Sequence, residues 1–180
     1  MRGQTPGVDV PPERLTASTE GDVESRRPWV LGYATARLYR ERLSVEAVAA
    51  LDPMTLLTVR RTNAPTAGLE GLVASGAGGR GAVLPSALSA RAGRFAAARG
   101  LGLTLLQPDR SQLLLDPTPT TLTKASRAFA AELLAPAEGI RRYLQHLGAP
   151  TPAAFDAIAE RYRVDSRLVQ HQYENQLAGI

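Results

Sequence analysis

The chain has 180 residues, of which 44% are hydrophobic, which suffices for one core with a small appendage but not for two full domains. Its net charge of +4 is not by itself a nucleic-acid-binding signature, and the absence of cysteine excludes disulfides and thiolate metal sites. Without a signal-peptide pattern or an apolar run of about 18 residues, we expect a soluble, cytoplasmic protein with no membrane segment.

The first 50 residues divide into a polar part and a helical part. Residues 1–27 combine mixed charge with Pro-Pro, Gly and Ser and have almost no large apolar side chains, so they predict a flexible tail. Residues 29–50 carry apolar residues at helical spacing, and Ser44 marks the start of a second helix. The apolar stripe predicted to face the core consists of Val30, Tyr33, Ala34, Leu38 and Tyr39.

The next segment contains the best candidates for strands. Residues 54–62 show β-branched alternation before the turn sequence "NAPTAG", and residues 70–74 are a candidate partner strand. Residues 75–85, "SGAGGRGAVLP", are rich in glycine, which suits a phosphate-binding loop. They lack the Gly-Lys-Ser/Thr ending of such a loop, so we interpret them as a mobile hairpin tip or loop.

Helical patterns dominate the rest of the chain. A helix is predicted from about Ser86, and Gly100 and Gly102, each unfavourable by about 1 kcal/mol in a helix interior, predict its end near residue 99. A short apolar segment at 113–115 follows within a proline-punctuated loop. The later elements are a helix over 121–148 broken at Pro136, a helix over 152–162, and a last helix capped by Asp165 or Ser166. The pattern predicts a mainly α (α+β) fold with a small β-sheet.

Three of these stretches, "RFAAARGLGLTLL" (94–106), "SRAFAAELLAP" (126–136) and residues 155–177, together resemble the ImmA/IrrE family of zinc metallopeptidases. The second is the most specific, because six consecutive residues from Phe129 to Leu134 fit the family's "ANRFAAELLMP". The resemblance implies a compact zincin-like domain over residues 28–150. It also implies a C-terminal helical pair over 151–180 packed on that domain.

The same resemblance implies that the zinc site is lost. In the family, a His-Glu-x-x-His helix supplies two zinc ligands one turn apart and a glutamate that activates water. Here the corresponding residues are Arg99, Gly100 and Leu103. The acidic third ligand has only Thr123 and Ala125 as counterparts. None of these side chains ligates zinc or takes a proton, so no catalytic residue, metal or other cofactor is expected.

The remaining polar residues suggest no alternative catalytic site. His146 lies near a helix end, and His171 with Glu174 would need a further ligand to hold a metal. Glu132 and Glu138 are expected to face solvent or to pair with arginines, Arg141 and Arg142 being well placed.

The favoured hypothesis is a pseudoenzyme: a non-catalytic ImmA/IrrE-like domain that acts as a protein-binding or regulatory module, with a repressor or a complex subunit as partner. One alternative is a DNA-binding regulator, because residues 153–177 have the length and turn of a helix-turn-helix, with Arg161, Arg163 and Arg167 near the turn. Nucleic acid is not the favoured partner, since the second helix has few basic residues beyond Arg167. A metallopeptidase with an unrecognised site is the remaining alternative.

Overall fold

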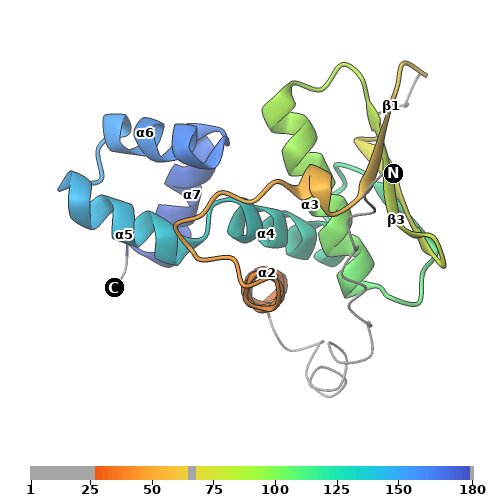
Figure 1. Ribbon diagram of the computed structural model, residues 1–180, viewed down its shortest axis with the longest axis horizontal. Helices are drawn as coiled ribbons and strands as arrows, with labels where there is room; N and C mark the ends of the chain where they lie inside the picture. The colour runs from red at the N-terminus through yellow and green to blue at the C-terminus, as the bar shows by residue number, and fades with distance from the viewer. Residues whose placement is uncertain (1–26, 65–67, 179–180) are drawn as a thin grey trace, which may run out of the picture.

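The computed structural model describes residues 27–64 and 68–178, which form an α+β fold of six α-helices and a four-stranded mixed sheet (Figure 1). The tail predicted over residues 1–27 lies outside the described residues except for Arg27. The elements in chain order are α2 (Pro28–Arg42), a 3-10 turn (Pro53–Thr55), β1 (Thr58–Thr62), β2 (Gly71–Gly76), β3 (Gly79–Pro85), α3 (Ala90–Leu106), β4 (Gln112–Leu115), α4 (Thr121–Leu134), α5 (Ala137–Leu147), α6 (Pro152–Tyr162) and α7 (Ser166–Gln176).

The sheet has the strand order β1-β3-β2-β4, with β1 parallel to β3 and the other two pairs antiparallel. The predicted pairing of residues 54–62 with 70–74 is wrong, because β3 lies between the two strands. The glycine-rich segment predicted as a loop contributes this strand, and only its tip forms a turn. Gly79, with φ of +98°, adopts the left-handed conformation that the tight β2–β3 connection requires.

Helix α3 packs against the sheet and continues through both of its glycines to Leu106 (Figure 1). The predicted end near residue 99 is therefore wrong, and so is the start near Ser86, since Ser89 caps the helix. A Cβ atom at Gly100 would lie 2.8 Å from Cγ2 of Val73 in β2. One at Gly102 would lie 2.6 Å from Cδ1 of Phe129 in α4. The glycines allow a close approach of α3 to its neighbours, and this packing offsets their low helix propensity.

Helix α2 packs on α4 through a face that differs from the predicted stripe. Val30 and Leu38 are 44% and 39% exposed, whereas Gly32, Ala36 and Tyr39 are buried. A side chain at Gly32 would collide with the backbone carbonyl of Ala125. The small residues thus set the distance between the two helices, which apolar periodicity alone does not reveal.

The second helix predicted after Ser44 is wrong, because this segment turns around the buried side chain of Arg40. The Arg40 guanidinium donates to the carbonyls of Glu46 and Ala49, the latter at 2.7 Å, and to the carbonyl of Leu133 at 2.6 Å. Carbonyl groups that accept hydrogen bonds from this guanidinium point toward it and not along a helix axis, so they do not form the backbone hydrogen bonds of a regular helix. Ser44 itself has a φ of +53°, which also interrupts a helix.

The predicted helices of the C-terminal half are confirmed. Helix α4 ends before Pro136, which begins α5 as its N-cap residue. The side chain of Thr151 caps α6, and that of Asp165 caps α7. Arg163 takes the left-handed conformation, φ +55°, and so reverses the chain between α6 and α7.

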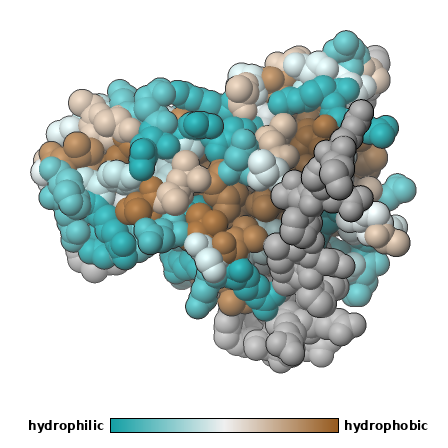
Figure 2. All heavy atoms as spheres, in the orientation of Figure 1, coloured by the Kyte–Doolittle hydropathy of each residue, from teal (hydrophilic) through white to brown (hydrophobic). Residues whose placement is uncertain are grey.

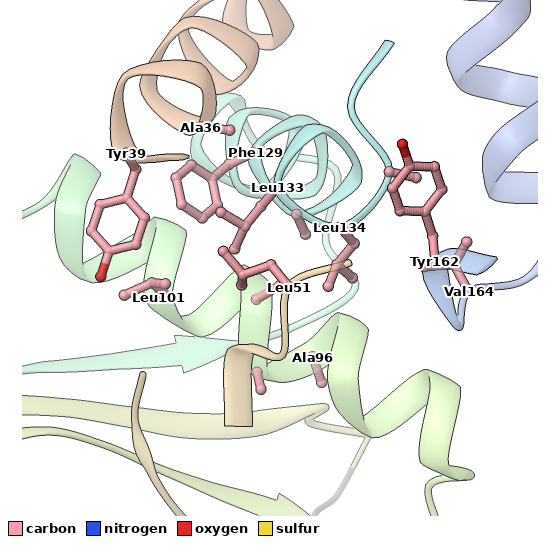
Figure 3. Close-up of a cluster of buried hydrophobic side chains, with 14 of the residues drawn as sticks. Ala36, Tyr39, Leu51, Ala96, Leu101, Phe129, Leu133, Leu134, Tyr162 and Val164 are labelled. Carbon is pink, nitrogen blue, oxygen red and sulfur yellow. The ribbon is translucent and has the colours of Figure 1, made fainter. Parts of the chain in front are cut away.

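One apolar core joins these layers. Phe129 and Leu133 of α4 are fully buried between α2 and α3, and the Phe129 ring lies 6.3 Å from that of Tyr39 (Figure 3). Hydrophobic residues also gather at the centre of the face in Figure 2, where the segment after α2 crosses the molecule in Figure 1. None of the described helices is long and apolar enough to cross a membrane.

Candidate functional site

Arg99 occupies the centre of the predicted degenerate zinc site and is only 1% exposed. Its guanidinium donates to the carboxylate of Glu70, just before β2, and to the carbonyl of Asp116, just after β4, at 3.1 Å. Burial is the main cause that lowers the pKa of Arg99 to about 10; Arg127 lowers it further and Asp116 opposes the shift. At pH 7 the side chain is still a cation.

Gly100 and Leu103 surround this cation on the same helix. Gly100 faces Val73 of the sheet, and Leu103 is 3% exposed within the core. Neither residue offers a lone pair or a titratable group to a metal or to a water molecule. The three α3 residues of the predicted site therefore lie close together, but they form an apolar environment around a buried arginine.

The two α4 positions of the predicted site are also buried, Thr123 at 7% and Ala125 at 2% exposure. Thr120 caps α4 by accepting a hydrogen bond from the backbone N–H of Thr123 at 3.1 Å, and its own hydroxyl lies 3.0 Å from that of Thr123. Within the described part of the chain, no group of three or more His, Cys, Asp or Glu side chains is placed to hold a metal. The residues present do not fit a zinc ion.

A groove of about 960 Å³ lies beside this buried centre, between α2, α3, α4 and α7. The base of the groove is apolar: Ala128 and Val164 are buried there, and Phe95, Leu168 and Tyr33 are half-buried. The other residues that line it are Arg27, Trp29, Ser89, Arg91, Ala92, Lys124, Arg127, Ala131, Asp165, Arg167, His171, Gln172 and Asn175.

Permanently charged cations form the rim of the groove and come from all four helical segments. They are Arg27, Arg91, Lys124, Arg127 and Arg167, and Asp165 is the one carboxylate among the described lining residues. Arg91 pairs with Glu160, and Arg127 lies 3.4 Å from Glu70. Neither Lys124 nor Arg167 forms an ion pair with any residue that the structure describes. Both of these cations line the groove.

Glu70 connects the buried centre with the groove. One of its carboxylate oxygens accepts from Arg99, and the other faces Arg127 on the groove rim. Glu70 is one-third exposed, whereas Arg99 is almost completely buried. Glu70 therefore contacts both the buried cation of Arg99 and the exposed cation of Arg127, which lines the groove.

The other polar residues singled out in the sequence have local roles. His171 lies on the groove wall, while Glu174 accepts a hydrogen bond from Gln170 at 2.8 Å. His146 is exposed, with Nδ1 2.7 Å from the carbonyl of Arg142.

The two glutamates flanking the α4 motif behave differently from each other. Glu138 pairs with Arg141 and Arg142 as expected, and their hydrogen bonds lower its pKa below the ordinary value. Glu132 is paired with an arginine, but it is only 1% exposed and its partner is Arg37 of α2, at 2.8 Å. The expected pairing of Glu132 with an arginine is therefore confirmed, although its partner is Arg37 of α2 and not Arg141 or Arg142, and the carboxylate is buried.

The groove itself was not identified from the sequence, because its residues come from four segments that only the tertiary fold brings together. A partial signal exists in the helical spacing: Arg91 and Phe95, Lys124 and Ala128, and Arg167 and His171 each lie four residues apart. No protein-family model matches the chain, and no curated protein matches it either.

Proposed function

We propose that the chain is a non-catalytic, ImmA/IrrE-like domain of zincin-like architecture that acts as a protein-binding or regulatory module. The observation that carries the proposal is the buried Arg99. It stands at the motif position of the first zinc-binding histidine, and its charge is already neutralised by Glu70. A guanidinium cation repels a metal ion and offers it no lone pair, so this position opposes zinc binding.

The arrangement of the motif segments supports the proposal. The two helices that carry the resemblance, α3 and α4, pack directly on each other through Gly102 and Phe129. Most of the six-residue stretch from Phe129 to Leu134 is buried, and α7 joins α4 through Gln172. The stretches that resemble the family thus pack on one another, with Arg99, Gly100 and Leu103 at the positions of the family's zinc-site residues.

The groove gives this domain a surface suited to binding. It is apolar at its base, cationic at its rim, and adjacent to the degenerate site through Glu70. A domain that has lost its metal ligands can still hold a protein such as a repressor or a complex subunit, because binding needs shape and charge rather than a catalytic centre. The proposed compartment is the cytoplasm.

The test is metal content measured together with peptidase activity. We expect purified protein to contain no stoichiometric zinc and to cleave no repressor-like protein, with or without added zinc. One zinc per chain, together with cleavage that a chelator abolishes, would falsify the proposal and would mean that the motif helix is misassigned.

A second candidate function is nucleic-acid binding through α6 and α7. The short connection at residues 163–165 and the exposed Arg161, Arg163 and Arg167 favour it. Glu174 on the exposed side of α7 opposes it, because a carboxylate repels phosphate. Anisotropy of a labelled duplex at several salt concentrations tests it: tight, salt-sensitive binding lost in Arg163→Ala/Arg167→Ala would support this candidate.

A further inference from the structure

We infer that the groove between α2, α3, α4 and α7 binds an acidic, amphipathic helix of a partner protein. The inference rests on the proposed function in taking a protein as the ligand, and it adds the chemistry and the shape of the segment that is recognised. It depends on three features of the groove: the apolar base, the uneven charge of the rim, and the environment of Trp29.

The base of the groove favours apolar side chains. Ala128 and Val164 are buried there, and Phe95 and Leu168 are half-buried, so branched aliphatic groups would find several apolar contacts. The walls are themselves helices, and a helix laid between helices can insert residues at positions i, i+3, i+4 and i+7. This geometry fits the apolar stripe of an amphipathic helix.

The rim selects the charge of the ligand. Five permanent cations and one carboxylate line the groove, whereas the whole chain has 21 basic and 17 acidic residues. Lys124 on α4 and Arg167 on α7 line the groove from different helices, and neither forms an ion pair with a described residue. Carboxylates flanking the apolar stripe of a bound helix would meet these cations, which steers association and fixes orientation.

The aromatic residues argue against a nucleic acid as ligand. Single strands bind through aromatic rings on which their bases stack. The Trp29 ring already carries the guanidinium of Arg27, whose carbon lies 5.8 Å from the ring centroid. Phosphates placed over the apolar base would lose hydration without gaining partners there.

Trp29 also supplies the measurement, because it is the only tryptophan in the chain and it lines the groove. The probe is a synthetic peptide without tryptophan, about 18 residues long, with leucines at helical spacing and glutamates flanking the leucine stripe. We expect the emission of Trp29 in the full chain to change saturably on titration. We expect at least tenfold weaker binding when the glutamates become lysines or the leucines become serines.

Two double variants of equal charge change locate the binding site. Lys124→Glu/Arg167→Glu reverses the charge of the two rim cations that form no ion pair with a described residue, and it should weaken peptide binding at least tenfold. Arg60→Glu/Arg110→Glu reverses two exposed arginines that do not line the groove, and its affinity should stay within twofold of the parent. Thermal melts of both variants confirm that they are folded before titration.

Several outcomes overturn the inference. One is equal affinity for the acidic and the basic peptide, and another is binding that the Lys124/Arg167 variant leaves intact. Tighter binding of an oligonucleotide by the same rim cations would assign the groove to nucleic acid. Higher peptide affinity after Glu20→Gln, Asp22→Asn and Glu24→Gln would show that the chain's own acidic segment occupies the groove. Dimerisation that the peptide disrupts would show that a second copy of the chain occupies it.

The proposed function can fail separately. Absence of peptide binding by a zinc-free, inactive protein would refute the groove inference alone. Zinc-dependent cleavage of a protein would refute the non-catalytic proposal whether or not the groove holds the acidic peptide.

Discussion

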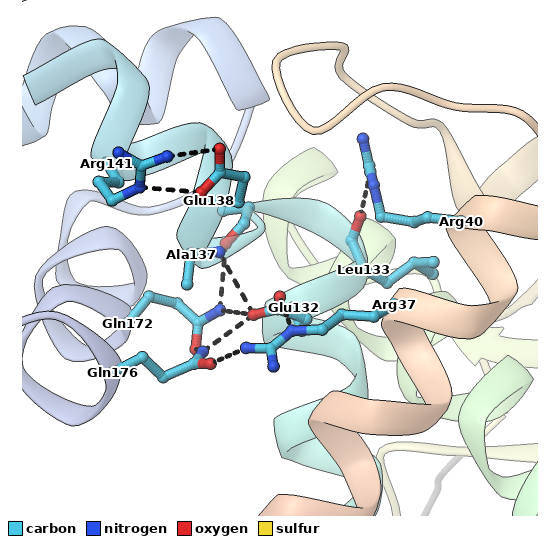
Figure 4. A network of polar contacts seen from close by, with 10 residues as sticks. Arg37, Arg40, Glu132, Leu133, Ala137, Glu138, Arg141, Gln172 and Gln176 are labelled. Atoms are coloured by element: carbon cyan, nitrogen blue, oxygen red, sulfur yellow. Dashed lines mark hydrogen bonds and ion pairs between the residues drawn. The ribbon is translucent and has the colours of Figure 1, made fainter. Parts of the chain in front are cut away.

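Gln172 of α7 donates its side-chain amide to Glu132 of α4 at 2.9 Å, and both residues are 1% exposed (Figure 4). The same carboxylate accepts from Arg37 and Gln176, and more weakly from the backbone N–H of Ala137 at 3.3 Å. A single buried carboxylate therefore joins α2 and α7, the first and last of the described helices, to the central α4.

Glu132→Ala should lower the free energy of unfolding by ~2–4 kcal/mol, because it leaves buried donors without an acceptor. Glu138→Ala is the matched control on the neighbouring helix. Its ion pairs are exposed, so its loss should cost less than about 1 kcal/mol. Urea unfolding measures both, and equal effects of the two substitutions would contradict the central role of Glu132.

Gly102→Ala should destabilise the protein by ~1–2 kcal/mol. The added methyl group collides with the base of the Phe129 ring, which cannot swing away, and this strain exceeds the gain in helix propensity. Gly78→Ala, with open space around it, should change stability by less than about 0.5 kcal/mol. A thermal shift for Gly102→Ala as small as that of Gly78→Ala would show that α3 and α4 are not in close contact.

Removing the two partners of the buried ion pair should have unequal effects. Glu70→Ala leaves the buried Arg99 cation uncompensated and should cost about 3 kcal/mol. Arg99→Met leaves Glu70 one-third exposed and still close to Arg127, so the loss should be nearer 1 kcal/mol. Chemical denaturation of both variants tests this order, and a larger loss for Arg99→Met would reverse it.

The stability difference between Arg99→Met and the parent should not change between pH 7 and pH 9. Burial lowers the pKa of Arg99 in the folded state to about 10, below its ordinary value. Well below pH 10 the side chain is charged in both the folded and the unfolded state, so folding releases no proton there. Only above about pH 10, where the folded state loses the proton first, does the desolvation penalty diminish, which stabilises the parent relative to the variant. A slope at neutral pH in paired urea titrations would disprove this.

Introducing the His-Glu-x-x-His motif into α3 should not create a tight metal site. Arg99→His/Gly100→Glu/Leu103→His supplies two imidazoles but no acidic third ligand at Thr123 or Ala125. The glutamate at position 100 would also be forced into Val73. We expect weak zinc binding by calorimetry and a lower melting temperature, and a variant with Thr123→Asp added should bind more tightly if it folds. Tight zinc binding by the folded triple variant would reveal a native third ligand.

The elements that the sequence predicted best are those with local boundary signals. Thr151, Asp165 and Pro136 mark helix ends by their own side chains or ring, and the structure places ends there. The errors came from residues whose role depends on distant partners. Gly100 terminates a helix in isolation, yet here it makes room for Val73. Arg40 looks like a surface residue in the sequence, yet it binds the carbonyls that a second helix would need.

In the candidate site, too, features that depend on local spacing could be predicted, whereas contacts between distant segments could not. The motif comparison could align Arg99, Gly100 and Leu103 with the zinc-site positions of the ImmA/IrrE motif, because their spacing on one helix is a local property. It could not identify Glu70 as the partner of Arg99, since these residues meet only when the sheet packs on α3. The comparison also could not show that Lys124, between Thr123 and Ala125, lines the groove, because the groove is formed only when four segments pack together.

The position of Glu70 between Arg99 and Arg127 would link binding of the proposed acidic ligand to the stability of the core. An acidic ligand that draws Arg127 away from Glu70 removes a competitor for that carboxylate and a positive charge near Arg99, whose pKa Arg127 lowers. The buried cation would then be more favourable in the bound state than in the free state. By reciprocity, a substitution that weakens the pair of Arg99 and Glu70 by different amounts in the free and the bound state changes the affinity of the groove by that difference.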